Sequence, residues 1–222
     1  MAQSPRRAGP FGGLSWQAAR TLLLASILAF AAYTAWGAFV SAFDNEDFPE
    51  SLAVKVELLP VVFPLHMVTG ALALVLLPLA LALRHRPGLH RIVGRIAAAD
   101  VLLSGLTAFP VAWVVPVTKV SAAGFSMQAA VWLVLLGLGV HFVRQGRREA
   151  HWTCMVLMVA TTSGAIVFRV FLALWALFGS MRRFEAFYAL DAWIAWMLPL
   201  GITAMVLFAQ RKRATLRGRP FL

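Results

Sequence analysis

Long apolar stretches dominate the sequence, and the polar residues gather in short segments between them. The hydrocarbon layer of a bilayer is about 30 Å thick, so a helix needs roughly 20 mostly apolar residues to cross it. Six stretches reach this length, at residues 21–43, 58–83, 92–117, 122–143, 152–178 and 187–209. Because lipid offers no hydrogen-bond partner to an unpaired backbone amide, each stretch is predicted to be a helix.

The predicted fold is an all-α, polytopic transmembrane bundle of six helices. This domain would occupy residues 21–209, between a basic N-terminal segment (residues 1–20) and a basic tail (residues 210–222). Two similar short connections, residues 84–91 and 144–151, each end on a histidine at the start of the returning helix. This repetition favours a four-helix core made of the second to fifth spans, with the first and last spans packed around it.

Basic residues flank the apolar stretches unevenly, and this asymmetry predicts the orientation of the chain. With the N-terminus in the cytoplasm, about fifteen Lys and Arg side chains lie inside and about four outside, the distribution that the positive-inside rule favours. An even number of spans then returns the C-terminus to the same side. We therefore expect both termini in the cytoplasm.

Composition excludes several classes of protein. Hydrophobic residues make up 61% of the chain and charged residues only 13%, whereas soluble domains have about 45–50% and about 25%. The net charge of +11 is explained by arginines that face anionic lipid headgroups, so the expected partner is the bilayer and not nucleic acid. The single cysteine, Cys154, excludes an intramolecular disulfide and a cysteine metal cluster. No catalytic triad, phosphate loop or zinc motif is found, so we assign no catalytic or metal-binding residue.

A few polar side chains lie inside the predicted spans, where a charge facing lipid costs at least a few kcal/mol. We expect His66, Arg169 and Asp191 to converge near the outer side of the membrane, with Tyr188 one turn before Asp191. Together they would form a pocket for a quinone headgroup, an anionic solute or a relayed proton. The structural alternative is an ion pair between Arg169 and Asp191 that ties two helices together. Asp100, deeper in the third span, is either part of a proton path or a protonated acid in an interhelical hydrogen bond.

The remaining histidines raise the question of haem. His90 and His151 open the third and fifth spans on one side of the membrane, and His141 closes the fourth span nearby. This arrangement allows one pair of haem ligands close to the cytoplasmic surface, without the C-x-x-C-H motif of c-type attachment. The alternative places these histidines at headgroup depth, where Arg91 and Arg95 contact lipid headgroups.

Three short motifs together resemble a known family. They are His66-x-x-x-Gly70-x-x-Ala73-Leu74, His90-Arg91-x-x-Gly94-Arg95, and His151-x-x-x-Met155 with Arg169 further along the same helix. Over residues 58–208 the chain resembles the bacterial membrane family called domain of unknown function 2306, which implies a bacterial inner-membrane location. Family members more often have a basic residue where this chain has Trp152. The histidine placement is also distantly similar to six-helix cytochromes of the b561 kind.

Two hypotheses of function follow from these residues. The first is an inner-membrane protein that binds a small ligand or lipid in its polar interior, or that serves as an accessory subunit of a membrane-protein partner, and we expect no ordinary enzyme. The second is a membrane electron-transfer protein that uses haem b or quinone. No cofactor follows from the first hypothesis, and haem b belongs to the second.

Overall fold

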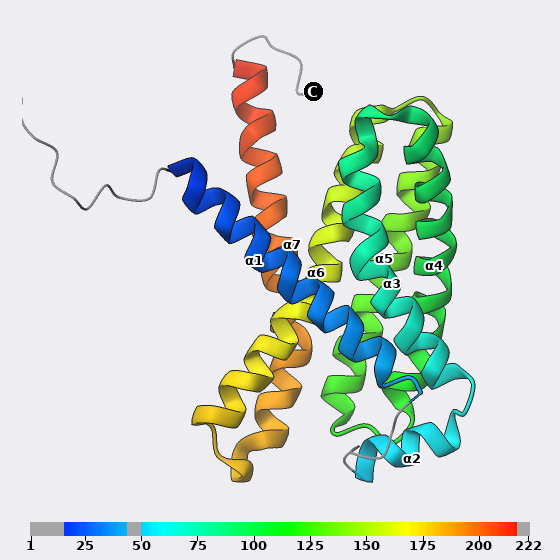
Figure 1. Ribbon diagram of the computed structural model, residues 1–222, viewed down its shortest axis with the longest axis vertical. Helices are drawn as coiled ribbons and strands as arrows, with labels where there is room; N and C mark the ends of the chain where they lie inside the picture. The colour runs from blue at the N-terminus through cyan, green and yellow to red at the C-terminus, as the bar shows by residue number, and fades with distance from the viewer. Residues whose placement is uncertain (1–15, 44–49, 217–222) are drawn as a thin grey trace, which may run out of the picture.

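The computed structural model describes residues 16–43 and 50–216, and these ranges contain helices and short connections but no strand (Figure 1). The elements in chain order are α1 (Trp16–Val40), α2 (Glu50–Leu58), α3 (Val62–Ala82), the 3-10 turn η1 (Leu83–His85), α4 (Pro87–Trp113), α5 (Lys119–Arg144), α6 (Arg148–Phe178), the 3-10 turn η2 (Met181–Arg183) and α7 (Phe184–Leu216). The predicted all-helical class is confirmed.

Five of these helical segments are long and apolar enough to cross a bilayer. They are α3 with η1, α4, α5, α6, and η2 with α7. Within the described residues, α1 contributes a shorter apolar stretch, Leu28–Val40. Within the described residues there are therefore five helical segments that could cross a bilayer and one helix with a shorter apolar part, and the predicted arrangement of six spans is not confirmed.

Helices α3 to α6 form a ring in which each packs on the next in sequence and α6 returns to α3. All four helices supply buried side chains to one core: Ala73, Leu77, Ala97, Val101, Leu136 and Met158. Helix α7 packs on α6 and α5, and α1 crosses the bundle obliquely against α3 and α6 (Figure 1). Large apolar side chains such as Leu106 and Met205 are more than half exposed on the outside, as the lipid-facing surface of a membrane protein requires.

The two ends of this bundle differ in what they carry. One end, which we call the hairpin end, holds the connections between α3 and α4 and between α5 and α6 and lies at the top of Figure 1. The other, which we call the α2 end, holds α2, the α4–α5 connection and η2.

Several helix boundaries differ from the predicted ones. Residues 50–58 form α2, which was not predicted, and the second span begins at Val62 instead of residue 58. Helix α4 ends at Trp113, ahead of the predicted residue 117, because Pro116 disfavours helical backbone at Val115, whose φ is +43°. Helix α7 continues to Leu216, so the predicted basic tail is helical over residues 210–216. Residues 1–15 and 217–222 of the two predicted terminal segments lie outside the described residues.

Two glycines allow α7 to approach its neighbours closely. A Cβ atom on Gly164 of α6 would lie 2.7 Å from the Cβ atom of Trp196 and 2.9 Å from its Cα atom. A Cβ atom on Gly124 of α5 would lie 2.8 Å from the carbonyl oxygen of Ala192. Since backbone atoms on α7 have little freedom to move, small residues are required at both positions.

Candidate functional site

His66 lies near the start of α3 and bonds across to α4. Its Nδ1 atom is 3.1 Å from the carbonyl oxygen of Ser104 and 3.3 Å from the hydroxyl of Thr107. The Thr107 hydroxyl donates to the Leu103 carbonyl oxygen at 2.8 Å, so both neighbours of Nδ1 act as acceptors. Nδ1 therefore carries the proton, and in a neutral imidazole Nε2 is left as an acceptor.

Arg169 on α6 follows Phe168, whose ring centre lies 5.3 Å from that of Tyr188. Its charge acts on the His66 imidazole and on the Tyr188 phenol, and the charge of Asp191 acts on the same phenol. We call His66, Arg169, Tyr188 and Asp191 the polar cluster. It joins α3, α6 and α7 in the half of the bundle at the α2 end.

Arg169 and Asp191 are not hydrogen-bonded to each other. The Asp191 side chain is 2% exposed, and neither carboxylate oxygen has a hydrogen-bond partner among the described residues. Arg169 donates through Nη1 to the carbonyl oxygen of Ala165 on its own helix, at 2.9 Å. The helix-tying pair that the sequence offered as a structural alternative is therefore not formed, because the arginine folds back along α6.

Aromatic rings surround the Tyr188 phenol. The ring centres of Phe125 and Phe168 lie 6.0 and 5.3 Å from that of Tyr188, both edge to face, and the Phe184 ring lies at 5.7 Å. Such rings give the cluster an apolar wall from α5, α6 and α7. A flat headgroup would find apolar surface on one side and polar atoms on the other.

Asp100 extends the polar positions along α4 toward the middle of the bundle. It is 6% exposed, and its Oδ2 atom has no hydrogen-bond partner. The buried hydroxyl of Ser104, one turn further along α4, has none either, although the carbonyl of the same residue accepts from His66. Of the two alternatives for Asp100, a proton path or an interhelical hydrogen bond, the structure shows no hydrogen bond at Oδ2 among the described residues, and both stay predictions.

Lys55 on α2 was not singled out from the sequence. Its ammonium group donates to the Val111 carbonyl oxygen at 3.0 Å, in the last turn of α4, where carbonyls lack a partner within the helix. Burial lowers the pKa of Lys55, and its charge reaches His66. An unpredicted helix thus adds a second cation to the surroundings of the polar cluster.

His90 and His151 lie together at the hairpin end. Their ring centres are 6.4 Å apart, with an angle of 77° between the planes. His141 is exposed, and its ring lies 5.7 Å from that of its neighbour Phe142. Arg91 and Arg95, predicted to contact lipid headgroups, are exposed at this end.

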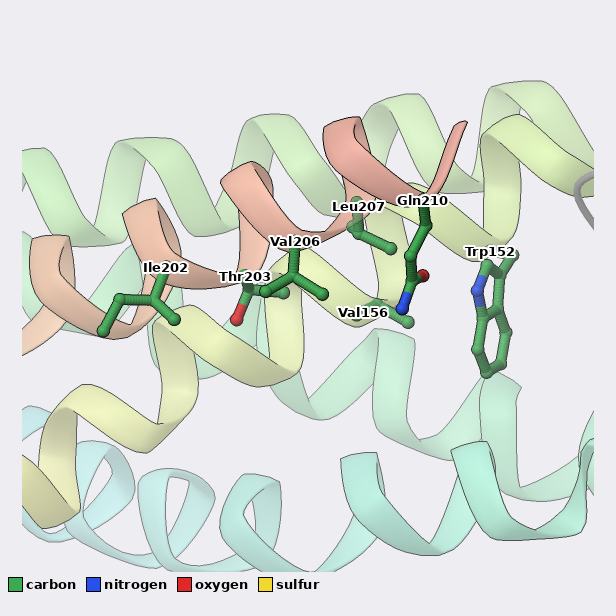
Figure 2. Close-up of a pocket in the computed structure, with 7 residues that line it drawn as sticks. All are labelled: Trp152, Val156, Ile202, Thr203, Val206, Leu207 and Gln210. Carbon is green, nitrogen blue, oxygen red and sulfur yellow. The ribbon is translucent and has the colours of Figure 1, made fainter. Parts of the chain in front are cut away.

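A hollow of about 310 Å³ lies between α6 and α7, away from the polar cluster (Figure 2). Its lining residues are Trp152, Val156, Ile202, Thr203, Val206, Leu207 and Gln210. Figure 2 shows the Gln210 amide extending toward Val156 and Trp152. The sequence did not predict this hollow. Its size depends on the distance between two apolar helices, and no sequence motif indicates that distance.

Comparison with known proteins shows which family the chain belongs to. Residues 63–207 match the model of a family described as "Predicted membrane protein (DUF2306)". The chain belongs to this family. The match runs from α3 into α7, so it contains the polar cluster and the histidine pair and leaves out α1. This DUF2306 membership confirms the resemblance read from the motifs, whereas the likeness to b561-type cytochromes stays a prediction. No curated protein and no solved structure matches the chain.

Proposed function

We propose that this DUF2306 protein lies in the bacterial inner membrane with both termini in the cytoplasm and binds a small lipophilic molecule at the polar cluster. The ligand carries an acceptor oxygen, either a carboxylate or a quinone carbonyl. One observation carries the proposal: among the described residues, Arg169 hydrogen-bonds to its own helix, and both oxygens of the buried Asp191 have no partner.

The N–H groups of Arg169 that remain beside its bond to Ala165 argue for a ligand. A guanidinium has five N–H groups in a rigid fork, and the bond to Ala165 uses one of them. A charge inside a membrane protein is costly and is usually retained for function or for a structural pair. Since the structural pair with Asp191 is not formed, a carboxylate or carbonyl oxygen from outside the chain is the partner that would compensate the charge.

The neighbours of Arg169 favour a flat, partly apolar molecule. His66 offers its Nε2 atom, and Tyr188 adds a hydroxyl next to the rings of Phe168 and Phe184. Asp191 supplies an acceptor for a hydroxyl group of the ligand, or a donor when it is protonated. Cation, phenol and aromatic wall together suit the headgroup of a quinone or the acid end of an aliphatic chain.

The test is ligand binding by the full chain in phosphatidylcholine nanodiscs, with decylubiquinone and decanoate as separate probes. Charged hydrogen bonds contribute about 1.5–3 kcal/mol, so Arg169→Gln is expected to weaken binding by about tenfold or more. Arg182→Gln, which removes an exposed arginine in η2 at the same end, is the matched control. The two probes distinguish a quinone site from a carboxylate site.

Two results would overturn the proposal. One is failure of the wild-type chain to bind either probe. The other is equal binding by wild type and by an Arg169→Gln variant whose thermal unfolding matches that of wild type.

A further inference from the structure

We propose that His90 and His151 are the axial ligands of one b-type haem bound at the hairpin end of the bundle. This site is separate from the polar cluster, and it does not depend on the function proposed there. The two histidines come from α4 and α6, which face each other across the four-helix ring, because each of them packs on both α3 and α5.

The spacing of the two rings fits a shared metal. Metal–imidazole bonds are about 2 Å long, so two imidazoles on opposite sides of one metal ion have their centres roughly 6 Å apart. The centres of His90 and His151 are 6.4 Å apart. No rearrangement of the helices is needed to reach this separation.

Backbone carbonyls fix both imidazoles in the form that binds metal. Nδ1 of His90 is 2.8 Å from the Ala80 carbonyl oxygen on α3, and Nδ1 of His151 is 2.9 Å from the Gly139 carbonyl oxygen on α5. A carbonyl only accepts, so each Nδ1 must donate its proton, and each neutral ring keeps a lone pair on Nε2. Histidines that ligate metals are held in this way by partners in their surroundings.

The same device occurs in both helical hairpins. In each, the histidine that opens the returning helix bonds to a carbonyl near the end of the descending helix. One hydrogen bond of this kind is a common structural contact. Here two such hydrogen bonds occur, one in each hairpin, and the two hairpins bring their histidines next to each other. This indicates one site to which both hairpins contribute.

The surroundings favour haem over a bare metal ion. The described residues contain no group of three or more His, Cys, Asp or Glu side chains that could hold a metal, whereas a porphyrin supplies the four remaining ligands itself. Arginines crowd the same end and would repel a free cation but attract the two propionates of haem. They are Arg84, Arg86, Arg91, Arg95, Arg144, Arg147 and Arg148.

The next turns into the bundle are apolar and suit the macrocycle. Met155 lies one turn beyond His151, and Ala97 lies two turns beyond His90, while Leu77 is one turn from Ala80 on α3. All three belong to the core described above or pack against it. The haem plane would therefore have apolar neighbours inside and arginines at its edge.

The experiment is the reduced-minus-oxidised absorption spectrum of the full chain, purified from haem-replete membranes, with the haem content measured per chain. We expect one low-spin haem per chain. His90→Ala and His151→Ala should each abolish the low-spin spectrum, whereas the control variants His85→Ala and His141→Ala, which change exposed histidines at the same end, should keep it. Arg169→Gln should keep it as well, which separates this site from the polar cluster.

A conservative variant distinguishes ligation from a structural role. His151→Met keeps a side chain able to bind iron, and a histidine–methionine pair raises the reduction potential of haem. The expected result is retained haem at a higher potential. The inference would be overturned by a colourless wild-type chain that takes up no added hemin, or by an unchanged spectrum and potential in the His151 variants.

Discussion

The hairpin end and the α2 end of the bundle differ in how their polar side chains are hydrogen-bonded. At the hairpin end, both His90 and His151 have their Nδ1 atoms bonded to backbone carbonyls, and the rings are held 6.4 Å apart. At the α2 end, within the part of the chain that the structure describes, Arg169 bonds to its own helix and both oxygens of Asp191 are buried without partners.

This difference indicates two kinds of binding. The chain itself orients the histidine pair, so a ligand there would meet acceptors that are already in place. The polar cluster contains a carboxylate without a hydrogen-bond partner among the described residues, so a ligand there would supply the missing partner. Unsatisfied buried groups destabilise a fold, and they are retained where function needs them.

The largest effect is expected from a substitution that separates α7 from the rest. Gly164→Leu places a side chain against the backbone of Trp196, and overpacking of this kind costs about 1–3 kcal/mol. We expect a clear fall in the thermal unfolding midpoint and loss of ligand binding at the polar cluster, because α7 carries Tyr188 and Asp191. The measurement is unfolding in detergent together with decylubiquinone and decanoate binding.

Gly137→Leu is the matched control for this substitution. No heavy atom lies within 4 Å of the Cβ position at Gly137 on α5, so its unfolding midpoint should stay near that of wild type. Equal destabilisation by the two leucines would show that close packing of α7 is not the cause. The histidine pair lies on α4 and α6, and it should persist in both variants.

A smaller effect is expected from removing the buried carboxylate. Asp191→Leu replaces an unpartnered group with an apolar one of similar volume, which is nearly neutral or stabilising by about 1 kcal/mol. The same change should weaken ligand binding at the polar cluster. Chemical unfolding and probe binding are the measurements, with Glu185→Leu, an exposed acid on the first turn of α7, as the control. Loss of stability in the Asp191 variant would mean that the carboxylate has a structural partner after all.

The smallest effect concerns Lys55 at the α2 end. Burial lowers the pKa of this amine, so the unfolded chain binds more protons than the folded chain over the range between the lowered pKa and the ordinary value of 10.5. The stability of the fold should therefore rise with pH through that range. Lys55→Met should flatten this part of the profile, as measured by unfolding at a series of alkaline pH values. An identical slope in the variant would assign the dependence to another group.

The spans were predictable from sequence because long apolar runs have one stable arrangement in lipid. The same reasoning missed α2, a nine-residue helix that is too short to span a bilayer and carries Lys55 and Glu57 among its apolar residues. It also extended α4 beyond Trp113, since hydropathy continues through a segment that Pro116 prevents from being helical.

For the candidate sites, the sequence predicted the level of each side chain along its helix, but not the direction in which the side chain points. Two histidines that open returning helices must lie at the same level, and they do meet. Arg169 and Asp191 were also expected to meet, yet the arginine turns back to Ala165. Spacing along a helix gives the level of a side chain, whereas its rotamer depends on neighbours that only the packed structure supplies.

Helix α7 is 33 residues long, which corresponds to about 50 Å, while the hydrocarbon layer measures about 30 Å. Its far end therefore stands clear of the lipid interior and carries Arg211, Lys212 and Arg213 on ordered backbone. Tyr188 and Asp191 belong to the other half of the same helix. A shift of α7 on ligand binding would thus displace a cluster of positive charge at its far end, with Pro199 as the point between them where the helix can bend.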